Sequence, residues 1–86
     1  MPYISSQRRE MLMPFLSALQ SFRIDTAGEL NYLITELCIR YRAEHGESYR
    51  VYNEIIGAIE CAKLELYRRV VVPLEEQKIK EHGDVY

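Results

Sequence analysis

Residues 48–72 read SYRVYNEIIGAIECAKLELYRRVVV and form the longest stretch with a clear hydrophobic period. Apolar side chains recur every three or four positions, which places them on one face of an α-helix. Ser48 is suited to cap this helix, and Pro73 predicts its end or a kink because proline lacks a backbone N–H. The apolar stripe consists of Val51, Ile55, Ile59, Ala62, Leu66 and Val70. The stretch therefore predicts one long helix.

This predicted helix is as long as a compact chain of this size is wide. At ~1.5 Å per residue it extends roughly 36 Å. A compact chain of 86 residues has a radius of gyration of about 12 Å, which corresponds to a ball about 30 Å across. The rest of the chain is then too small to shield the whole apolar stripe from water. A second copy is the simplest cover, so we expect a homo-oligomer.

Composition indicates a globular protein with one small domain. Hydrophobic residues make up 48% and charged residues 28%, and the net charge of −2 argues against a general nucleic-acid binder. No apolar run approaches the ~20 residues of a membrane span, and no signal-peptide pattern is present. Cys38 and Cys61 lie inside helical patterns without metal-type spacing. We expect a cytoplasmic protein with reduced, semi-buried thiols and no membrane partner.

The first half of the chain predicts two further helices. Ser5 or Ser6 can cap a first helix that begins near Gln7. Pro14 either kinks this helix or starts a second one at its first position, and we favour a break near Met13. Thr26 and Glu29 match a capping box, in which the glutamate folds back to the threonine. The second helix is expected over 27–44, and Gly46 suits the position that follows its end.

After Pro73, residues 74–81 are rich in Glu and Lys and predict a short polar helix or an extension that stops near Gly83. Residues 82–86 are expected to be a loose tail. The predicted fold is all-α: one small domain over 1–86, with three to four helices and a long C-terminal helix, assembled as a homo-oligomer.

One group of polar residues forms a candidate ligand site. Lys63 projects inside the apolar stripe and Glu60 lies at its edge. Such a lysine is explained either by an ion pair or exposed ammonium, or by contact with a ligand. Arginine, lysine and tyrosine side chains suit a phosphate and a base, although the same residue types are enriched at oligomer interfaces. The candidate ligand-binding residues are Asn31, Tyr32, Asn53, Glu60, Lys63, Tyr67 and Arg68.

No strong catalytic or metal motif is present, so we predict no catalytic residue, metal ligand or cofactor. His45 and His82 have no ligand spacing between them. Carboxylates on the two longer helices leave one alternative, a metal-dependent all-α nucleotide pyrophosphohydrolase. The residues concerned are Glu29, Glu36, Glu54 and Glu60. They lack the paired pattern of acidic residues by which such enzymes hold Mg²⁺.

The segments GELNYLITEL, NEIIGAIECAKLELYRRVVVPLEEQKI and the terminal GDVY resemble a family of small proteins of phage and bacterial genomes without an established activity. MPYI at the start also fits. Ala27 replaces the usual proline of the family, and Leu74 stands where tyrosine is expected. The resemblance implies a phage-encoded accessory role, such as binding a host protein or sequestering a nucleotide signal used in host defence.

Together these observations predict a small, non-enzymatic, homo-oligomeric binding protein. Its expected partners are further copies of itself and either an anionic or nucleotide ligand or a host protein. The pyrophosphohydrolase is the alternative.

Overall fold

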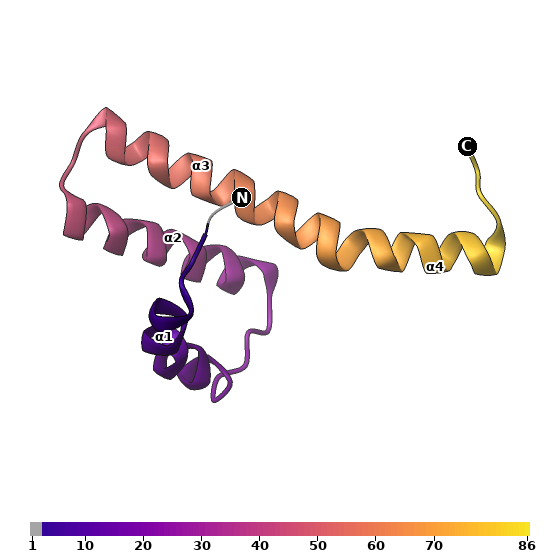
Figure 1. The fold of residues 1–86 in the computed structure, drawn as a ribbon, viewed down its shortest axis with the longest axis horizontal. Helices are drawn as coiled ribbons and strands as arrows, with labels where there is room; N and C mark the ends of the chain where they lie inside the picture. The colour runs from indigo at the N-terminus through magenta and orange to yellow at the C-terminus, as the bar shows by residue number, and fades with distance from the viewer. Residues whose placement is uncertain (1–2) are drawn as a thin grey trace. The chain divides into compact units, whose positions relative to one another are not determined.

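The computed structural model describes residues 3–86, and the described residues form helices and connections without a strand. The elements in order are α1 (Ser6–Leu19), α2 (Ala27–His45), α3 (Tyr49–Leu66), the π-helical segment η1 (Tyr67–Val71) and α4 (Val72–His82), as Figure 1 shows. The predicted all-α class and the long C-terminal helical part are confirmed. Contacts group the residues into two compact units, one that ends at Glu47 and one over Ser48–Tyr86.

The first unit contains α1 and α2, joined by residues 20–26. The Ser5 hydroxyl accepts from the Arg8 N–H at 3.2 Å and caps α1, as the sequence predicts. Pro14 lies inside α1, so the predicted break near Met13 is wrong. Proline removes the bond to the carbonyl of Glu10 and crowds that carbonyl, but its fixed φ suits a helix and α1 continues to Leu19. The apolar side of α1 therefore runs on through Pro14.

The start and end of α2 follow from local chemistry. The Thr26 hydroxyl accepts from the Glu29 N–H at 3.1 Å, which confirms the predicted cap. The Glu29 carboxylate accepts from the N–H of Asp25 at 3.1 Å, one residue before the predicted partner Thr26. The helix ends at His45, and Gly46 follows with a φ of 88°, a conformation that residues with a Cβ rarely adopt.

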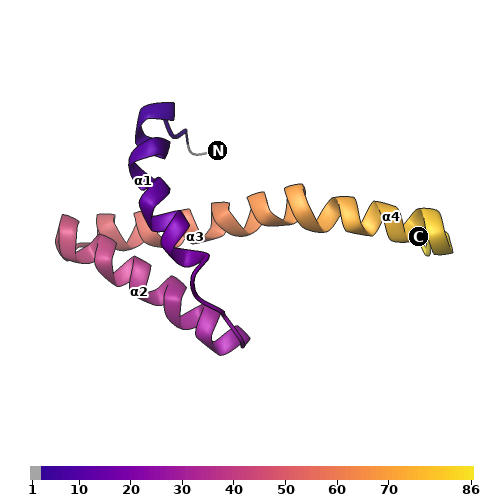
Figure 2. The same ribbon diagram turned by 90° about the horizontal axis from the view of Figure 1, so that it is seen from below.

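The second unit is a single helical rod, in which α3, η1 and α4 follow one another without interruption (Figures 1 and 2). Ser48 caps α3 by accepting from the N–H of Val51 at 3.1 Å. The rod neither ends nor breaks at Pro73. Instead the backbone widens before it, and the N–H of Val72 bonds to the carbonyl of Tyr67, five residues back.

The wider turn has a physical cause in Pro73. In an α-helix its ring would press on the carbonyl of Arg69 and leave that carbonyl without a donor. A π-helical turn takes up one extra residue and relieves this conflict. The short helix predicted after Pro73 is confirmed by α4, which stops at Gly83 with a φ of 86°.

Very few side chains are buried. Among residues 3–86 only Val51 and Ile55, in the first turns of α3, fall in the buried class. The rest of the predicted stripe on this helix is exposed. Cys38 is half-buried as expected, whereas Cys61 is exposed, and neither forms a disulfide. None of the described helices is both long and apolar enough to cross a membrane.

Candidate functional site

Four of the predicted ligand-binding residues lie along one side of the rod. Asn53 and Glu60 are seven positions apart, which returns them to nearly the same direction after two turns. Lys63 and Tyr67 follow at three and seven positions from Glu60 and lie within a quarter turn of it. We call Asn53, Glu60, Lys63 and Tyr67 the polar strip. Arg68 belongs to the neighbouring side of the rod.

Lys63 has a partner within its own helix. Its Nζ lies 3.0 Å from Oε1 of Glu60, and both side chains are more than half exposed. The structure thus supplies the ion pair that the sequence offered as one of two explanations for this lysine. An exposed pair of this kind contributes little to stability. Its main effect is to cancel most of the positive charge at the centre of the polar strip.

Arg68 and Arg69 share one carboxylate. The guanidinium groups of both residues lie 2.8 Å from the two oxygens of Glu65. The Arg69 hydrogen bond, opposed by desolvation and aided by Arg68, holds the pKa of Glu65 below its ordinary value of 4.5. Glu65 and Arg68 are three positions apart, a spacing at which helical side chains meet. Arg69, four positions from Glu65, completes a three-residue cluster.

The Tyr67 hydroxyl donates to Oε1 of Glu75 at 2.8 Å. This hydrogen bond and the negative charge of Glu75 raise the pKa of Tyr67 above its ordinary value of 10.0. Glu75 was not among the predicted site residues. A separation of eight positions is not a spacing at which α-helical side chains meet, so only the π-helical turn reveals this contact.

Asn31 and Tyr32 belong to the other unit, in the first turns of α2. The Asn31 carbonyl and Oδ1 accept from the Thr35 hydroxyl, at 2.9 and 3.4 Å. The side chain of Tyr32 is 63% exposed. Both residues are exposed.

The chemistry open to the second unit follows from these pairs. Three basic and two acidic side chains lie between Glu60 and Arg69, which leaves one net positive charge. An anion that contacts Lys63 or Arg68 therefore competes with a carboxylate already in place. Glu54 likewise pairs with Arg50 at 3.2 Å. Within residues 3–86 no group of three or more His, Cys, Asp or Glu side chains is placed to hold a metal ion.

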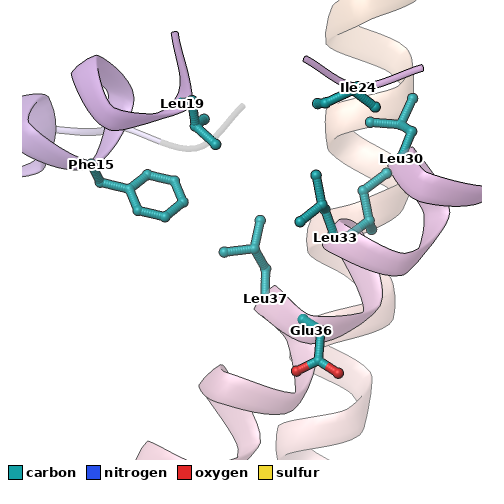
Figure 3. Close-up of a pocket in the computed structure, with 8 residues that line it drawn as sticks. Phe15, Leu19, Ile24, Leu30, Leu33, Glu36 and Leu37 are labelled. Carbon is teal, nitrogen blue, oxygen red and sulfur yellow. The ribbon is translucent and has the colours of Figure 1, made fainter. Parts of the chain in front are cut away.

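The first unit carries a different feature, an apolar hollow of about 350 Å³ between α1 and α2. Figure 3 shows Phe15 and Leu19 of α1 on one side and side chains of α2 on the other, with the Phe15 ring directed toward Leu37. The lining includes Phe15, Leu19, Ile24, Leu30, Leu33 and Leu37, and Glu36 is its only charged residue. All of these apolar side chains are accessible.

The chain as a whole matches one family model, described as a domain of unknown function (DUF6899), over residues 1–85. The match covers nearly the entire sequence, so the chain belongs to this family. No curated protein and no solved structure shows significant similarity to this chain.

Proposed function

We propose that this chain is a non-enzymatic interaction protein that works as a homo-oligomer. The observation that supports the proposal is the amount of surface that one copy leaves accessible. Because only Val51 and Ile55 are buried among the described residues, a single copy has almost no hydrophobic core. Apolar burial is the main source of folding free energy, so the remaining apolar side chains need cover beyond what their own helices give, and a second copy can supply it.

The accessible surface of the chain is 8019 Å². A folded monomer of 10.2 kDa exposes about 5300 Å². Two independently compact units, divided at Glu47, would together expose about 6400 Å². The accessible surface of the chain exceeds the value for two compact units by about 1600 Å². A standard interface buries about 800 Å² on each partner. The surplus is thus large enough for an extensive interface or for two interfaces of ordinary size.

The character of this surface also favours permanent association. Exposed apolar side chains occur on every helix, among them Phe15, Leu37, Ile56, Val70 and Leu74. Monomeric proteins rarely expose contiguous apolar patches of more than a few hundred Å². Interfaces of obligate homo-oligomers resemble a domain core cut in half. A second copy of the chain meets this requirement without any other component.

The polar strip is the part that we propose contacts a ligand, of the anionic or nucleotide class. Lys63 and, beside the strip, Arg68 supply positive charge, and Tyr67 supplies an aromatic face for a base. Since Glu60 and Glu65 already hold these cations, we expect weak binding that is sensitive to salt. In the phage setting implied by the sequence resemblance, such a module would act on a host component.

Sedimentation velocity over a wide range of concentration tests self-association, with circular dichroism to report helix content. We expect a helical oligomer that dissociates only on strong dilution. A monomer that stays helical and unfolds cooperatively at every concentration would overturn the proposal. Thermal shift with nucleotides tests the ligand: we expect a shift that Lys63→Ala and Arg68→Ala abolish without dissociating the oligomer.

A further inference from the structure

We infer that the apolar hollow of the first unit is the contact between copies, and that the same face of a second copy closes it across a two-fold axis. This inference rests on the proposed self-association and specifies which surface carries it. Four observations lead to it: the depth and lining of the hollow, the lack of a core in the first unit, its projecting apolar groups, and its charge.

The hollow is suited to receive side chains of a protein partner. Its volume of about 350 Å³ exceeds that of the apolar cavities that stay empty inside proteins, which are of the order of 150 Å³. Phe15 and Leu37 face each other from α1 and α2 without closing the space between them (Figure 3). Water in this space would contact almost only carbon, so its replacement by apolar groups is favourable.

The first unit has no buried side chain in its described part. Among residues 3–47 every side chain is at least partly exposed. Both helices of the first unit are thus regular and capped, but their contact with each other leaves no side chain buried. Short helices are marginal in water without tertiary packing. An isologous pair would join four such helices around one shared core.

In a two-fold contact, each copy must supply exposed apolar side chains that fill the hollow of the other copy. The first unit has both the hollow and such side chains. Phe22, between the lining residues Leu19 and Ile24, is 73% exposed. Met11, one turn before Phe15 on α1, is 67% exposed. In the proposed contact, these exposed side chains of one copy enter the hollow of the other. Since each copy gives and receives the same groups, the contact closes at two copies and does not propagate.

The small net charge of the first unit is compatible with pairing of two copies and offers little attraction for a strongly charged partner. In α1 two arginines stand against one glutamate, and in α2 three glutamates stand against two arginines. A two-fold contact that places α1 of one copy on α2 of the other therefore joins a slightly basic helix to a slightly acidic one. The unit is close to neutral, so two copies approach without strong repulsion.

The test compares two leucines of similar exposure in different units. Leu37→Glu places a charge at the hollow, where 53% of the residue is exposed, and Leu64→Glu places the same charge on α3, where 57% is exposed. We expect Leu37→Glu to weaken dimerisation by roughly 100-fold or more in sedimentation equilibrium, as loss of a central anchor does. We expect Leu64→Glu to leave the dimerisation constant within about threefold, because a surface residue outside the contact contributes little.

Isotope-filtered nuclear Overhauser spectra of mixed labelled and unlabelled wild-type protein provide a second measurement, which does not depend on how a variant folds. Contacts between Leu37 methyl groups of one copy and Phe15 or Phe22 of the other would support the inference. Dissociation by Leu64→Glu alone, or a dimer whose filtered spectra lack these contacts, would overturn the inference but keep the proposed self-association. A monomeric wild type would overturn both. A monomer that carries a small apolar molecule in native mass spectrometry would assign the hollow to that ligand.

Discussion

The hydroxyl of Tyr67 and the carboxylate of Glu75 lie 2.8 Å apart although eight positions separate them. In a uniform α-helix, eight residues turn the chain by about 800°, which leaves two side chains about 80° out of line. The extra residue in η1 makes the separation equivalent to about seven α-helical positions, or about 700°. The two long side chains then share one face, so their hydrogen bond reports on the π-helical turn.

Replacing Pro73 tests the origin of this turn. In Pro73→Ala the backbone N–H returns and the ring no longer presses on the carbonyl of Arg69, so we expect η1 to relax into an α-helix. Tyr67 and Glu75 would then rotate apart and lose their hydrogen bond. Carbon-13 chemical shifts would show regular helix through residues 67–71, and the pKa of Tyr67 would return toward 10.0. An unchanged hydrogen bond would show that the π-helical turn has another cause.

The Tyr67–Glu75 contact also predicts a dependence on alkaline pH. Glu75 raises the pKa of Tyr67 in the folded state, so the protonated tyrosine binds its proton more tightly folded than unfolded. The contribution to stability is complete below the unfolded value near 10.0 and is lost as pH rises through the higher folded value. The ultraviolet difference titration between wild type and Tyr67→Phe isolates this group among the seven tyrosines.

The hydrogen bond to Glu75 is the largest cause of the raised pKa of Tyr67, and the negative charge of Glu75 is the second. Glu75→Gln keeps a hydrogen-bond acceptor and removes the charge. We expect the titration to move to lower pH in this variant. Tyr49→Phe is the matched control, because it removes an exposed tyrosine of the same unit. A Tyr67 titration that does not respond to Glu75→Gln would contradict the contact.

Neutralising Glu65 tests whether the basic residues of the rod can bind an anion. In Glu65→Gln, Arg68 and Arg69 lose a charged partner that each contacts at 2.8 Å. We expect affinity for pyrophosphate at low salt to rise roughly fivefold, from the removal of one nearby negative charge. Isothermal titration calorimetry measures the change, with Glu76→Gln on α4 as a control of equal charge. Equal effects of the two variants would show that only the net charge matters.

The same cluster responds to acid in a defined direction. Arg69 and Arg68 lower the pKa of Glu65, so its contribution to stability is present above 4.5 and is lost as pH falls through the lower folded value. A carbon-13 titration of the Glu65 carboxyl follows this step. If Arg69 is the larger cause, Arg69→Gln will raise the pKa of Glu65 more than Arg68→Gln does.

The parts of the fold that depend on nearby residues could be predicted from the sequence. Ser5, Thr26 and Ser48 each cap a helix by a bond to a backbone N–H three positions ahead, so residue type and position suffice. The ion pair of Glu60 with Lys63 has the same short range. The break near Met13 was predicted wrongly because a proline next to good helix formers can either start a helix or remain inside one. The hydrophobic pattern of the sequence is the same in both cases.

Two features could not be predicted because they depend on more than local spacing. The contact of Tyr67 with Glu75 exists only after the π-helical turn changes the phase of the helix. The apolar hollow was unexpected for another reason: the hydrophobic period shows which side of a helix avoids water but does not show whether the same chain covers it. Leu33 and Leu37 follow the pattern of a core and are nevertheless accessible.

The small buried core gives the last prediction, which compares two valines on the rod. Val51 is fully buried and Val70 is 58% exposed. Val51→Ala removes two buried methyl groups and leaves a cavity, so we expect a loss of about 2 kcal/mol in the free energy of unfolding. Val70→Ala is expected to cost less than about 1 kcal/mol, as exposed substitutions usually do. Urea unfolding at one fixed protein concentration measures both values. Equal losses would mean that the exposed face of the rod is covered in the assembled protein, and that copies meet through the second unit as well as the first.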